Sequence, residues 1–343
     1  MFCDTRKTAA ILIAVCTIMV LAAVAIFLLH DSEQPEDITV ENETVPVPAR
    51  VPVPGIKTVT STNDEDPPNQ ENVLFAPWGD AAGELGRKEP AEGAPEGPMS
   101  FVVAEDGQVY VLDQVNRRVQ VFKDGKFARQ YEIPGDTFQD LAVDPDGRVV
   151  LLDRLAQKSV VFLDPEQRIP LEGPRVPEGG GVTGLFAQDD GVWVEVEHQK
   201  LVRIADASGK ADPQRPWVPG RHSMDGAWLL SAALDGRKAA VISVRPVDSD
   251  DAPAALRVEF GEKILFLTAL ESDPEGNIYL GARLEKAEVL VILASDGTEQ
   301  ARIALPVSGL ELEQFRSLRM GQDGGVYLLH FAGPGATLIR IVW

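Results

Sequence analysis

A short phrase that recurs six times constrains the fold of this chain more than any other feature of its sequence. Each copy is an acidic residue and a glycine followed by a short apolar stretch, which in five of the six copies carries an aromatic residue at the matching position. The acids are Asp106, Asp146, Asp190, Asp225, Glu275 and Asp323, and the matching positions are Tyr110, Val150, Trp193, Trp228, Tyr279 and Tyr327. Successive matching positions lie 35 to 51 residues apart. A tight turn and a strand that return at this period are typical of the blades of a β-propeller.

Apolar segments on both sides of the phrase predict the other strands of each blade. A large apolar residue stands five positions before the acid in five copies, namely Phe101, Leu141, Leu185, Leu270 and Leu318, whereas the fourth copy has Gly220 there. Third strands are expected at 118–122, 159–163, 201–204, 239–244, 289–293 and 338–342, and fourth strands at 127–133 and 299–305. The sequence therefore predicts an all-β, six-bladed propeller over residues 72–343, with an irregular fourth blade around residues 220–228.

The last repeat stops at Trp343, directly after its third strand, and has no fourth strand of its own. The apolar segment 72–78 precedes the first blade and has no other obvious partner. We predict that this segment supplies the missing outer strand and closes the ring, which would remove two open sheet edges at once.

The apolar run at residues 9–29 predicts a transmembrane helix. It contains 21 residues without a charge, and at 1.5 Å per residue it spans about 30 Å, the thickness of the bilayer core. Arg6 and Lys7 precede it and acidic residues follow it, so the positive-inside rule places residues 1–8 in the cytoplasm. A cleaved signal peptide is the alternative, but its apolar region is shorter, about 7–15 residues. We expect a single-pass anchor in the inner (cytoplasmic) membrane, with a periplasmic or extracellular propeller.

Residues 30–71 predict a disordered linker. Seven prolines fall between Pro35 and Pro68, and the stretch shows no helical or strand period. Alternating proline prevents helix and favours polyproline II, a semi-rigid spacer. We interpret the stretch as a stalk, with a docking site for a partner as the alternative.

Charge and cysteine content exclude some classes of function. The formal net charge is −21, and binding to nucleic acid needs clustered lysine and arginine, so no nucleic-acid partner is expected. The two cysteines, Cys3 and Cys16, both lie before the propeller. The propeller therefore contains no disulfide, and a core of this size needs none.

The first repeat carries a more specific pattern. Gly83, Gly86 and Gly97 precede a stretch that reads Phe-Val-Val-Ala-Glu-Asp-Gly-Gln-Val-Tyr-Val-Leu-Asp-Gln-Val-Asn-Arg-Arg-Val-Gln-Val-Phe over residues 101–122. This stretch resembles an NHL repeat. The second repeat keeps the register at Asp153, Lys158 and Phe162, and the other four keep only the turn and the strand.

The NHL resemblance implies a six-bladed propeller that offers a binding surface to protein, RNA or small ligands. RNA-binding members are basic, and this chain is not. We expect Asp113, Asn116 and Arg118, which carry the resemblance, to be structural, with a strand-end aspartate that accepts hydrogen bonds from the next turn and from the arginine.

No catalytic motif stands out in the propeller. His198, His222 and His330 fall in different blades without the spacing of metal ligands, and neither a calcium loop nor a nucleophile motif is present. No catalytic, cofactor-binding or metal-binding residue is therefore predicted, and no cofactor is expected. Polar residues on the expected inner strands could line an axial channel, namely Gln139, Asp140, Thr183, Thr268, Arg316 and Ser317.

These observations favour a membrane-tethered, extracytoplasmic propeller that acts as a protein-binding platform in the cell envelope, and they favour a binding role over an enzymatic one without deciding between the two. Its partners would be the membrane, through residues 9–29, and an envelope protein, which one propeller face or the segments 173–181 and 247–253 would contact. Two alternatives stay open: a propeller hydrolase or lactonase with an axial metal, and a sensor of a small ligand.

Overall fold

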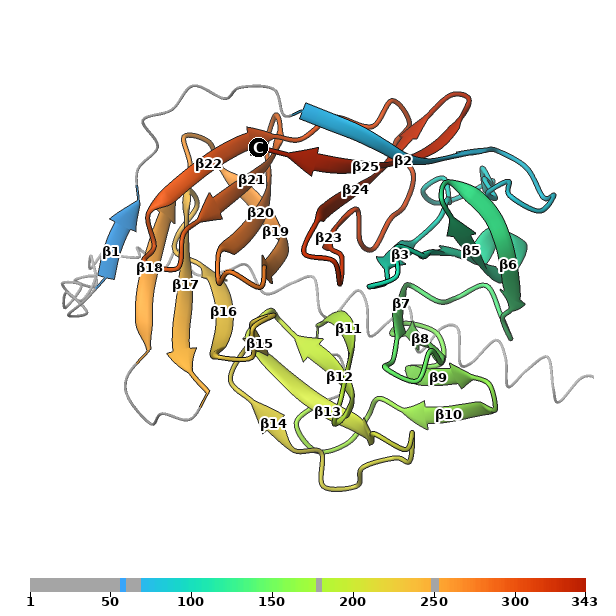
Figure 1. The fold of residues 1–343 in the computed structure, drawn as a ribbon, viewed down its shortest axis with the longest axis horizontal. Helices are drawn as coiled ribbons and strands as arrows, with labels where there is room; N and C mark the ends of the chain where they lie inside the picture. The colour runs from blue at the N-terminus through green and yellow to red at the C-terminus, as the bar shows by residue number, and fades with distance from the viewer. Residues whose placement is uncertain (1–55, 60–68, 177–180, 248–252) are drawn as a thin grey trace, which may run out of the picture. The chain divides into compact units, whose positions relative to one another are not determined.

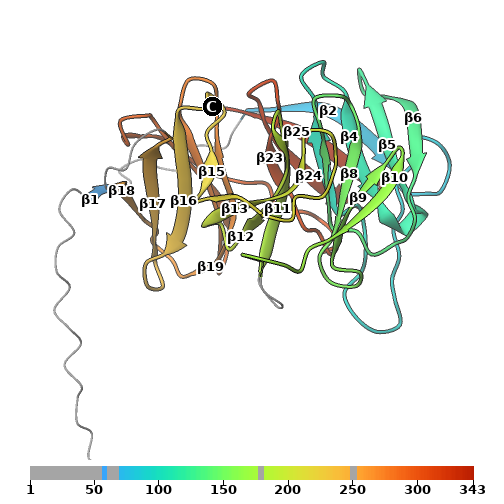
Figure 2. The same ribbon diagram turned by 90° about the horizontal axis from the view of Figure 1, so that it is seen from below.

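The computed structural model describes residues 56–59, 69–176, 181–247 and 253–343, all of which belong to one compact unit that runs from Val53 to Trp343. Within this unit, six mainly antiparallel sheets surround a common centre (Figure 1). Figure 2 shows the ring from its rim, with strands that run between its two faces. The predicted all-β, six-bladed propeller is confirmed.

In each of the first five blades, four strands follow one another along the chain from the innermost strand outward. The first three are β3 (Ser100–Val103), β4 (Val109–Asp113), β5 (Arg118–Lys123) and β6 (Lys126–Glu132); β7 (Asp140–Val143), β8 (Val149–Asp153), β9 (Ser159–Leu163) and β10 (Glu166–Pro170); and β11 (Val182–Gln188), β12 (Gly191–Val196), β13 (Lys200–Asp206) and β14 (Trp217–Val218). The next two are β15 (Arg221–His222), β16 (Trp228–Leu234), β17 (Ala239–Pro246) and β18 (Ala254–Glu259); and β19 (Ile264–Ser272), β20 (Ile278–Leu284), β21 (Glu288–Leu293) and β22 (Glu299–Ala304).

The sixth blade closes the ring with a strand from the other end of the unit. Its inner strands are β23 (Leu318–Met320), β24 (Val326–Ala332) and β25 (Gly335–Val342), and β2 (Asn69–Pro77) is its outermost strand. β2 pairs antiparallel with β25, from Asn69 opposite Val342 to Pro77 opposite Gly335. The predicted closure is therefore confirmed, and the closing strand begins at Asn69, three residues before the predicted start of the propeller at 72.

The repeated phrase forms the turn between the first and second strands of each blade. All six of its glycines have positive φ, for example +76° at Gly107 and +82° at Gly276, a conformation that glycine adopts without steric cost. The apolar residues five positions before the acid are all buried. The aromatic residues are buried too, with one exception: Trp228 is 37% exposed. That exception lies in the fourth blade.

The fourth blade is irregular in the way the sequence indicates. Its innermost strand, β15, has only two residues. Gly220, which precedes this strand, has a φ of +111° and lies close to the Leu230 carbonyl: a Cβ at this position would be 2.4 Å from the oxygen. The blade also has a fifth, outermost strand, β1 (Ile56–Val59), which pairs parallel with β18.

Strands β1 and β2 correct the interpretation of residues 30–71 as a linker without strands. β1 lies inside that stretch, and β2 begins within it. Short apolar segments between prolines carry little period of their own, and an open sheet edge of the propeller gives these segments their hydrogen-bond partners. The proline run at 46–54 and the predicted anchor at 9–29 lie outside the described residues. Within the described ranges, no helix has the length and apolar character needed to cross a membrane.

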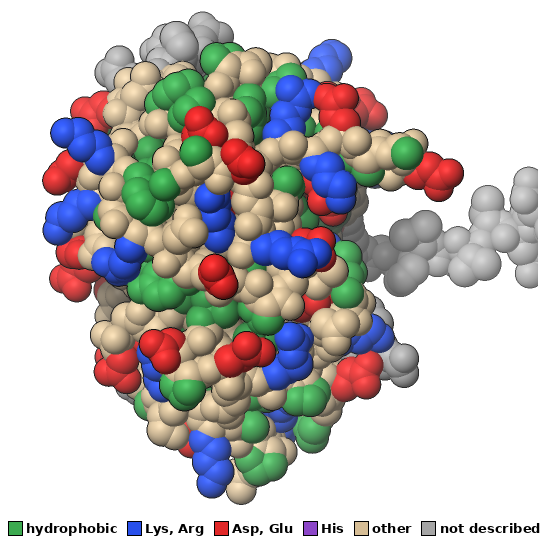
Figure 3. All heavy atoms as spheres, turned by 90° about the vertical axis from the view of Figure 1, so that its right-hand side faces the viewer, with side chains coloured by type: hydrophobic (Ala, Val, Ile, Leu, Met, Phe, Trp, Pro, Cys, Tyr) green, Lys and Arg blue, Asp and Glu red, His purple; other side chains and the backbone are tan. Residues whose placement is uncertain are grey.

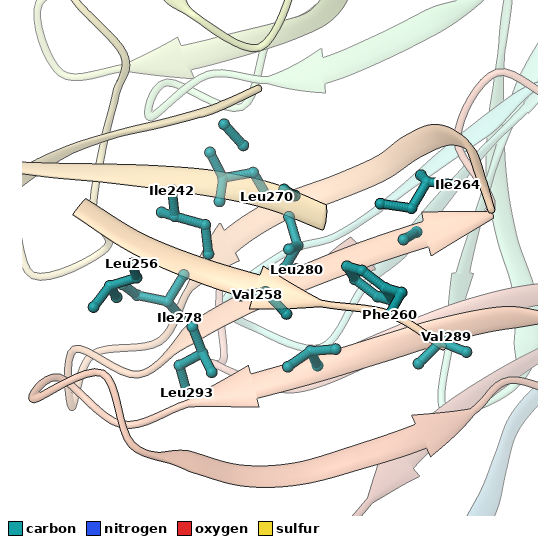
Figure 4. Close-up of a cluster of buried hydrophobic side chains, with 14 of the residues drawn as sticks. Ile242, Leu256, Val258, Phe260, Ile264, Leu270, Ile278, Leu280, Val289 and Leu293 are labelled. Carbon is teal, nitrogen blue, oxygen red and sulfur yellow. The ribbon is translucent and has the colours of Figure 1, made fainter. Parts of the chain in front are cut away.

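The core lies between neighbouring blades. In the cluster between the fourth and fifth blades, Ile242 and Val258 face Leu270, Leu280 and other apolar residues of the next blade (Figure 4). Both faces of most middle strands are buried in this way, which explains their nearly continuous apolar sequences. The side of the molecule that Figure 3 shows mixes acidic and basic side chains with scattered apolar ones.

The residues that carry the NHL resemblance hold the loop before the first blade. Asp113 is fully buried and accepts hydrogen bonds from the Gly86 N–H (2.8 Å), Asn116 Nδ2 (3.0 Å) and Arg118 Nε (2.9 Å). Arg118 in turn donates to the carbonyl oxygens of residues 80, 81 and 84. Their expected structural role is confirmed.

Candidate functional site

A cavity of about 550 Å³ opens at one end of the ring axis. Its walls come from the beginnings of inner strands β11 and β19, from the turn after β12, and from the connection between β22 and β23. Four of the residues predicted to line an axial channel, Thr183, Thr268, Arg316 and Ser317, line this cavity. We call it the axial cavity.

The other two predicted channel residues, Gln139 and Asp140, do not line the axial cavity. Asp140 is fully buried and accepts hydrogen bonds from Ser100 Oγ (2.6 Å) and from the Leu185 N–H (2.9 Å). Gln139 donates to the Thr137 carbonyl and accepts from the Arg154 N–H. Both side chains bind neighbouring strands and loops together.

A layer of ion pairs crosses the centre of the ring beneath the axial cavity. Arg221 lies 2.6 Å from a Glu195 oxygen and 3.1 Å from a Glu271 oxygen. Arg316 Nε lies 3.1 Å from Asp140, and its Nη1 lies 3.8 Å from Glu271. These residues come from different blades, so the layer ties inner strands together across the axis.

The electrostatics of Glu195 follow from this pairing. Burial alone would disfavour its ionised form, but the charge of Arg221 and the hydrogen bond from His198 outweigh burial and hold the pKa of Glu195 well below its usual range. Glu195 also accepts a hydrogen bond from the Thr183 hydroxyl at 2.8 Å. The Glu195 carboxylate is therefore ionised, and its oxygens contact Arg221, His198 and Thr183.

Arg319 completes the layer and has fewer charged contacts. It donates to the carbonyl oxygens of Phe101 (3.0 Å) and Leu141 (2.9 Å), and lies 3.4 Å from Asp140. Burial and the neighbouring charge of Arg316 lower the pKa of Arg319 to about 10. It remains cationic at neutral pH, and with a further bond to the Leu185 carbonyl (3.3 Å) it joins three blades through their backbones.

A smaller cavity of about 150 Å³ shares Arg221 and Glu271 with the axial cavity. Its other walls include the ends of inner strands β11 and β23. Because one ion pair lines both spaces, the Arg221–Glu271 pair lies between them and interrupts the axis.

The walls of the axial cavity combine apolar surface with arginine. Four arginines and three glutamates line it, in a protein whose net charge is −21. Two of these arginines carry a buried N–H for which no acceptor lies among the described residues: Nε of Arg154 and Nη2 of Arg316. Such unsatisfied buried donors are uncommon in folded proteins.

Each of these two guanidinium groups is held by an aromatic ring. Arg154 lies over Phe315, 4.8 Å from its centroid, and Arg316 lies over Phe186 at 4.7 Å. Burial lowers the pKa of Arg154, as expected for a guanidinium drawn partly out of water. The rings and walls fix the orientation of both groups.

The three histidines stay apart. His198 contacts Glu195 at 2.8 Å, and His330 Nε2 contacts the Val307 carbonyl at 3.0 Å. His222 packs against Trp193, and burial lowers its pKa. Among the residues the structure describes, no group of three or more His, Cys, Asp or Glu side chains could hold a metal ion. The carboxylates nearest the axis are each paired with arginine, so this donor set does not fit the axial metal of the hydrolase alternative.

Sequence reasoning missed Arg154, Arg221, Glu195, Glu271 and Arg319. Glu271 and Arg319 fall on expected inner strands, where alternation could have revealed them. Arg221 follows Gly220, where the repeat loses its register, and Arg154 stands in a loop after β8 of the second blade. Nothing local marks either residue as part of a site.

Comparisons with known proteins match the chain only to other solved structures. No protein-family model matches the sequence, and no curated protein matches it either. A streptogramin B lyase is similar at 14% identity and a TM-score of 0.47, over 80% of this chain and 97% of that one. A gluconolactonase from Xanthomonas campestris is similar at 15% identity and a TM-score of 0.45, over 79% of this chain and 98% of that one.

A third similar structure is a protein from Thermus thermophilus described as a putative oxidoreductase (glucose dehydrogenase). The two chains are 14% identical with a TM-score of 0.45, over 80% of this chain and 100% of that one. Similarity at this level assigns no activity to the present chain.

Proposed function

We propose that this chain is a membrane-tethered ligand-binding module, and that the axial cavity binds a small organic anion. The observation that carries the proposal is the pair of buried, unaccepted N–H groups on Arg154 and Arg316 in an apolar-walled cavity. A volume of about 550 Å³ lies in the range of ordinary small-molecule sites. The charge of the Arg154 guanidinium in the cavity wall would attract a carboxylate or sulfonate.

The proposal keeps the small-ligand alternative and sets the metal-dependent hydrolase aside. A protein partner in the envelope is the second candidate. Phe266 and Val307 line the axial cavity and are 56% and 65% exposed, so they offer apolar surface at its mouth, a feature typical of interaction sites.

Membrane tethering and NHL character are parts of the same proposal. The uncharged run at residues 9–29 supports a single-pass anchor, with the propeller outside the inner membrane. The buried Asp113–Arg118 pair at 2.9 Å supports an NHL-like first blade.

The anion proposal can be tested with 8-anilinonaphthalene-1-sulfonate, an apolar anion whose fluorescence rises on binding. The fragment 53–343 is suitable, because it contains all six blades and their cores within one compact unit. We expect saturable binding, weakened about tenfold or more by Arg154→Met, since a charge-assisted hydrogen bond contributes about 1.5–3 kcal/mol.

The matched control is Arg117→Met, which removes one positive charge from a side chain that is 66% exposed and is not part of the cavity lining. Equal affinity of the Arg154→Met and Arg117→Met fragments would refute an anion site at Arg154.

A further inference from the structure

The innermost strand of the fifth blade begins with apolar residues that the rest of the ring does not cover. Leu265, Phe266 and Leu267 follow one another near the start of β19, and the first two are 45% and 56% exposed. The innermost strands of the first two blades, β3 and β7, are by contrast buried along their whole length. Contiguous apolar surface in contact with water is the informative exception in a folded protein.

Two irregularities of β19 enclose this apolar segment. The pairing with β20 shifts register between Ile264 and Phe266 and again between Leu267 and Ala269. Bulges of this kind redirect side chains and are over-represented next to functional sites. Phe266 and Leu267, which lie between the two shifts, both line the axial cavity.

The connection between β22 and β23 continues the apolar wall. Pro306, Val307, Leu310 and Leu312 line the cavity from this connection, and Val307 is 65% exposed. The Leu310 N–H donates to the Phe331 carbonyl at 3.3 Å, which holds the connection against the sixth blade. The fifth blade and this connection together therefore present an apolar wall to the cavity.

The cation that carries the proposed anion site lies across the ring axis from this wall. Arg154 follows β8 of the second blade, whereas Phe266 belongs to the fifth, and in a ring of six these two blades lie opposite each other (Figure 1). Both residues line the same cavity. A ligand that contacts both must therefore be extended, with its charge at one end.

Other charged side chains of the cavity wall already have partners within the protein. Glu271 pairs with Arg221 and Arg316 in the ion-pair layer. Glu288 hydrogen-bonds with Thr268. These groups are engaged with one another, so the contacts left for the far end of a ligand are mainly apolar.

We propose that the ligand of the axial cavity is a carboxylate with an unbranched apolar chain, whose charged head lies at Arg154 and whose chain covers Phe266 and Val307. This inference rests on the proposed anion site and adds the chemical class of its ligand. A compact polar anion would leave the apolar wall in water. An acid with a second charge at its far end would lose the hydration of that charge against the wall.

The test compares straight-chain acids that displace 8-anilinonaphthalene-1-sulfonate from fragment 53–343. Butanoate, hexanoate and octanoate share one carboxylate and differ only in chain length. We expect affinity to rise about fourfold for each added methylene group, since each one buried leaves water for an apolar wall. Octanedioate, which adds a second carboxylate to the chain of octanoate, should compete about tenfold more weakly than octanoate.

Variants locate the two ends of the ligand. Phe266→Ser and Val307→Ser should each weaken octanoate by about fivefold and leave butanoate unchanged, and two variants are used so that a folding defect in one does not decide the result. Arg154→Met should weaken all three acids alike. Phe75→Ser is the matched control, because Phe75 is 52% exposed and is not part of the cavity lining. The affinity of the probe is measured first for each variant, since the probe is itself apolar.

Three outcomes would overturn the inference. If butanoate competes as strongly as octanoate, the apolar chain is refuted and the anion site stands. If the gain with chain length is the same in Phe266→Ser, Val307→Ser and Phe75→Ser, the chain does not lie on this wall, and the anion site again stands. If neither the probe nor any acid binds in a manner that depends on Arg154, the anion site and the chain proposal both fall.

Discussion

Buried charge at the axis is tolerated because each side chain has opposite charge or backbone oxygen around it. Glu195 alone contacts Arg221, His198 and Thr183. An uncompensated charge in this position would cost several kcal/mol. The layer therefore specifies how the inner strands meet, and its individual members can be tested by neutral substitutions.

Glu195→Gln should destabilise the propeller at pH 7 by about 3 kcal/mol, since it leaves the buried Arg221 with Glu271 as its remaining carboxylate. For a unit of this size, the melting temperature should fall by about 5–10 °C. The measurement is thermal unfolding by circular dichroism, with the exposed Glu132→Gln as control.

The same variant predicts a pH dependence. The pKa of Glu195 is lowered in the folded state, so its stabilising contribution is complete above the unfolded value of about 4.5 and is lost as the pH falls through the folded value. The stability gap between the unmodified protein and Glu195→Gln should therefore narrow below about pH 4.5. A gap that stays constant down to about pH 3 would contradict the charged pairing.

Gly184→Ala should weaken binding of the fluorescent anion by several-fold. A Cβ on Gly184 would lie 1.8 Å from Arg316 Nη2 and 2.9 Å from the Phe186 ring, so the guanidinium must move from its place at the cavity. Gly333→Ala, which meets nothing within 4 Å, is the control. The affinity of each variant is measured by titration with the fluorescent probe. Identical affinities of the two variants would show that the position of Arg316 does not affect anion binding.

At the scale of elements, the strands differ in how clearly their own sequences predict them. Turn glycines, the aromatic residues after them and short apolar strands are local signals, and they predicted all six blades and the irregularity of the fourth. Strand β1 gave no such signal, because a four-residue strand acquires its structure from the edge of β18. The closing strand β2 was recognised only because the sixth blade needed a partner.

The closing strand offers a test with an internal control. Leu74 on β2 is buried in the cluster between the first and sixth blades, whereas the adjacent Phe75 points outward and is 52% exposed. Leu74→Asp should destabilise the ring by about 3–5 kcal/mol, since it buries an unpaired charge in place of an apolar side chain. Phe75→Asp should change stability by less than about 1 kcal/mol. Urea denaturation of both variants compares them, and equal midpoints would contradict the closure.

At the scale of the whole molecule, the proposed function depends on which side of a membrane the propeller occupies. In the proposed topology the ring lies outside the inner membrane, because Arg6 and Lys7 flank the apolar run on its N-terminal side. A cysteine introduced at the exposed Lys126 should then react with a membrane-impermeant maleimide in intact cells with a permeable outer envelope. A cysteine introduced at Thr5 should react only after the membrane is disrupted. Labelling in the reverse order would overturn the topology.

The sequence by itself determined the repeat, the number of blades, the turn positions and the need for a closing strand, because each depends on residues that are near one another in the chain. The axial site was decided only by tertiary structure. Arg154, Arg221, Glu271 and Arg316 are separated by about 45 to 67 residues along the chain, and each appears locally as an ordinary charged residue. They meet because the propeller brings its inner strands to one axis, where burial and opposite charge give most of them their partners.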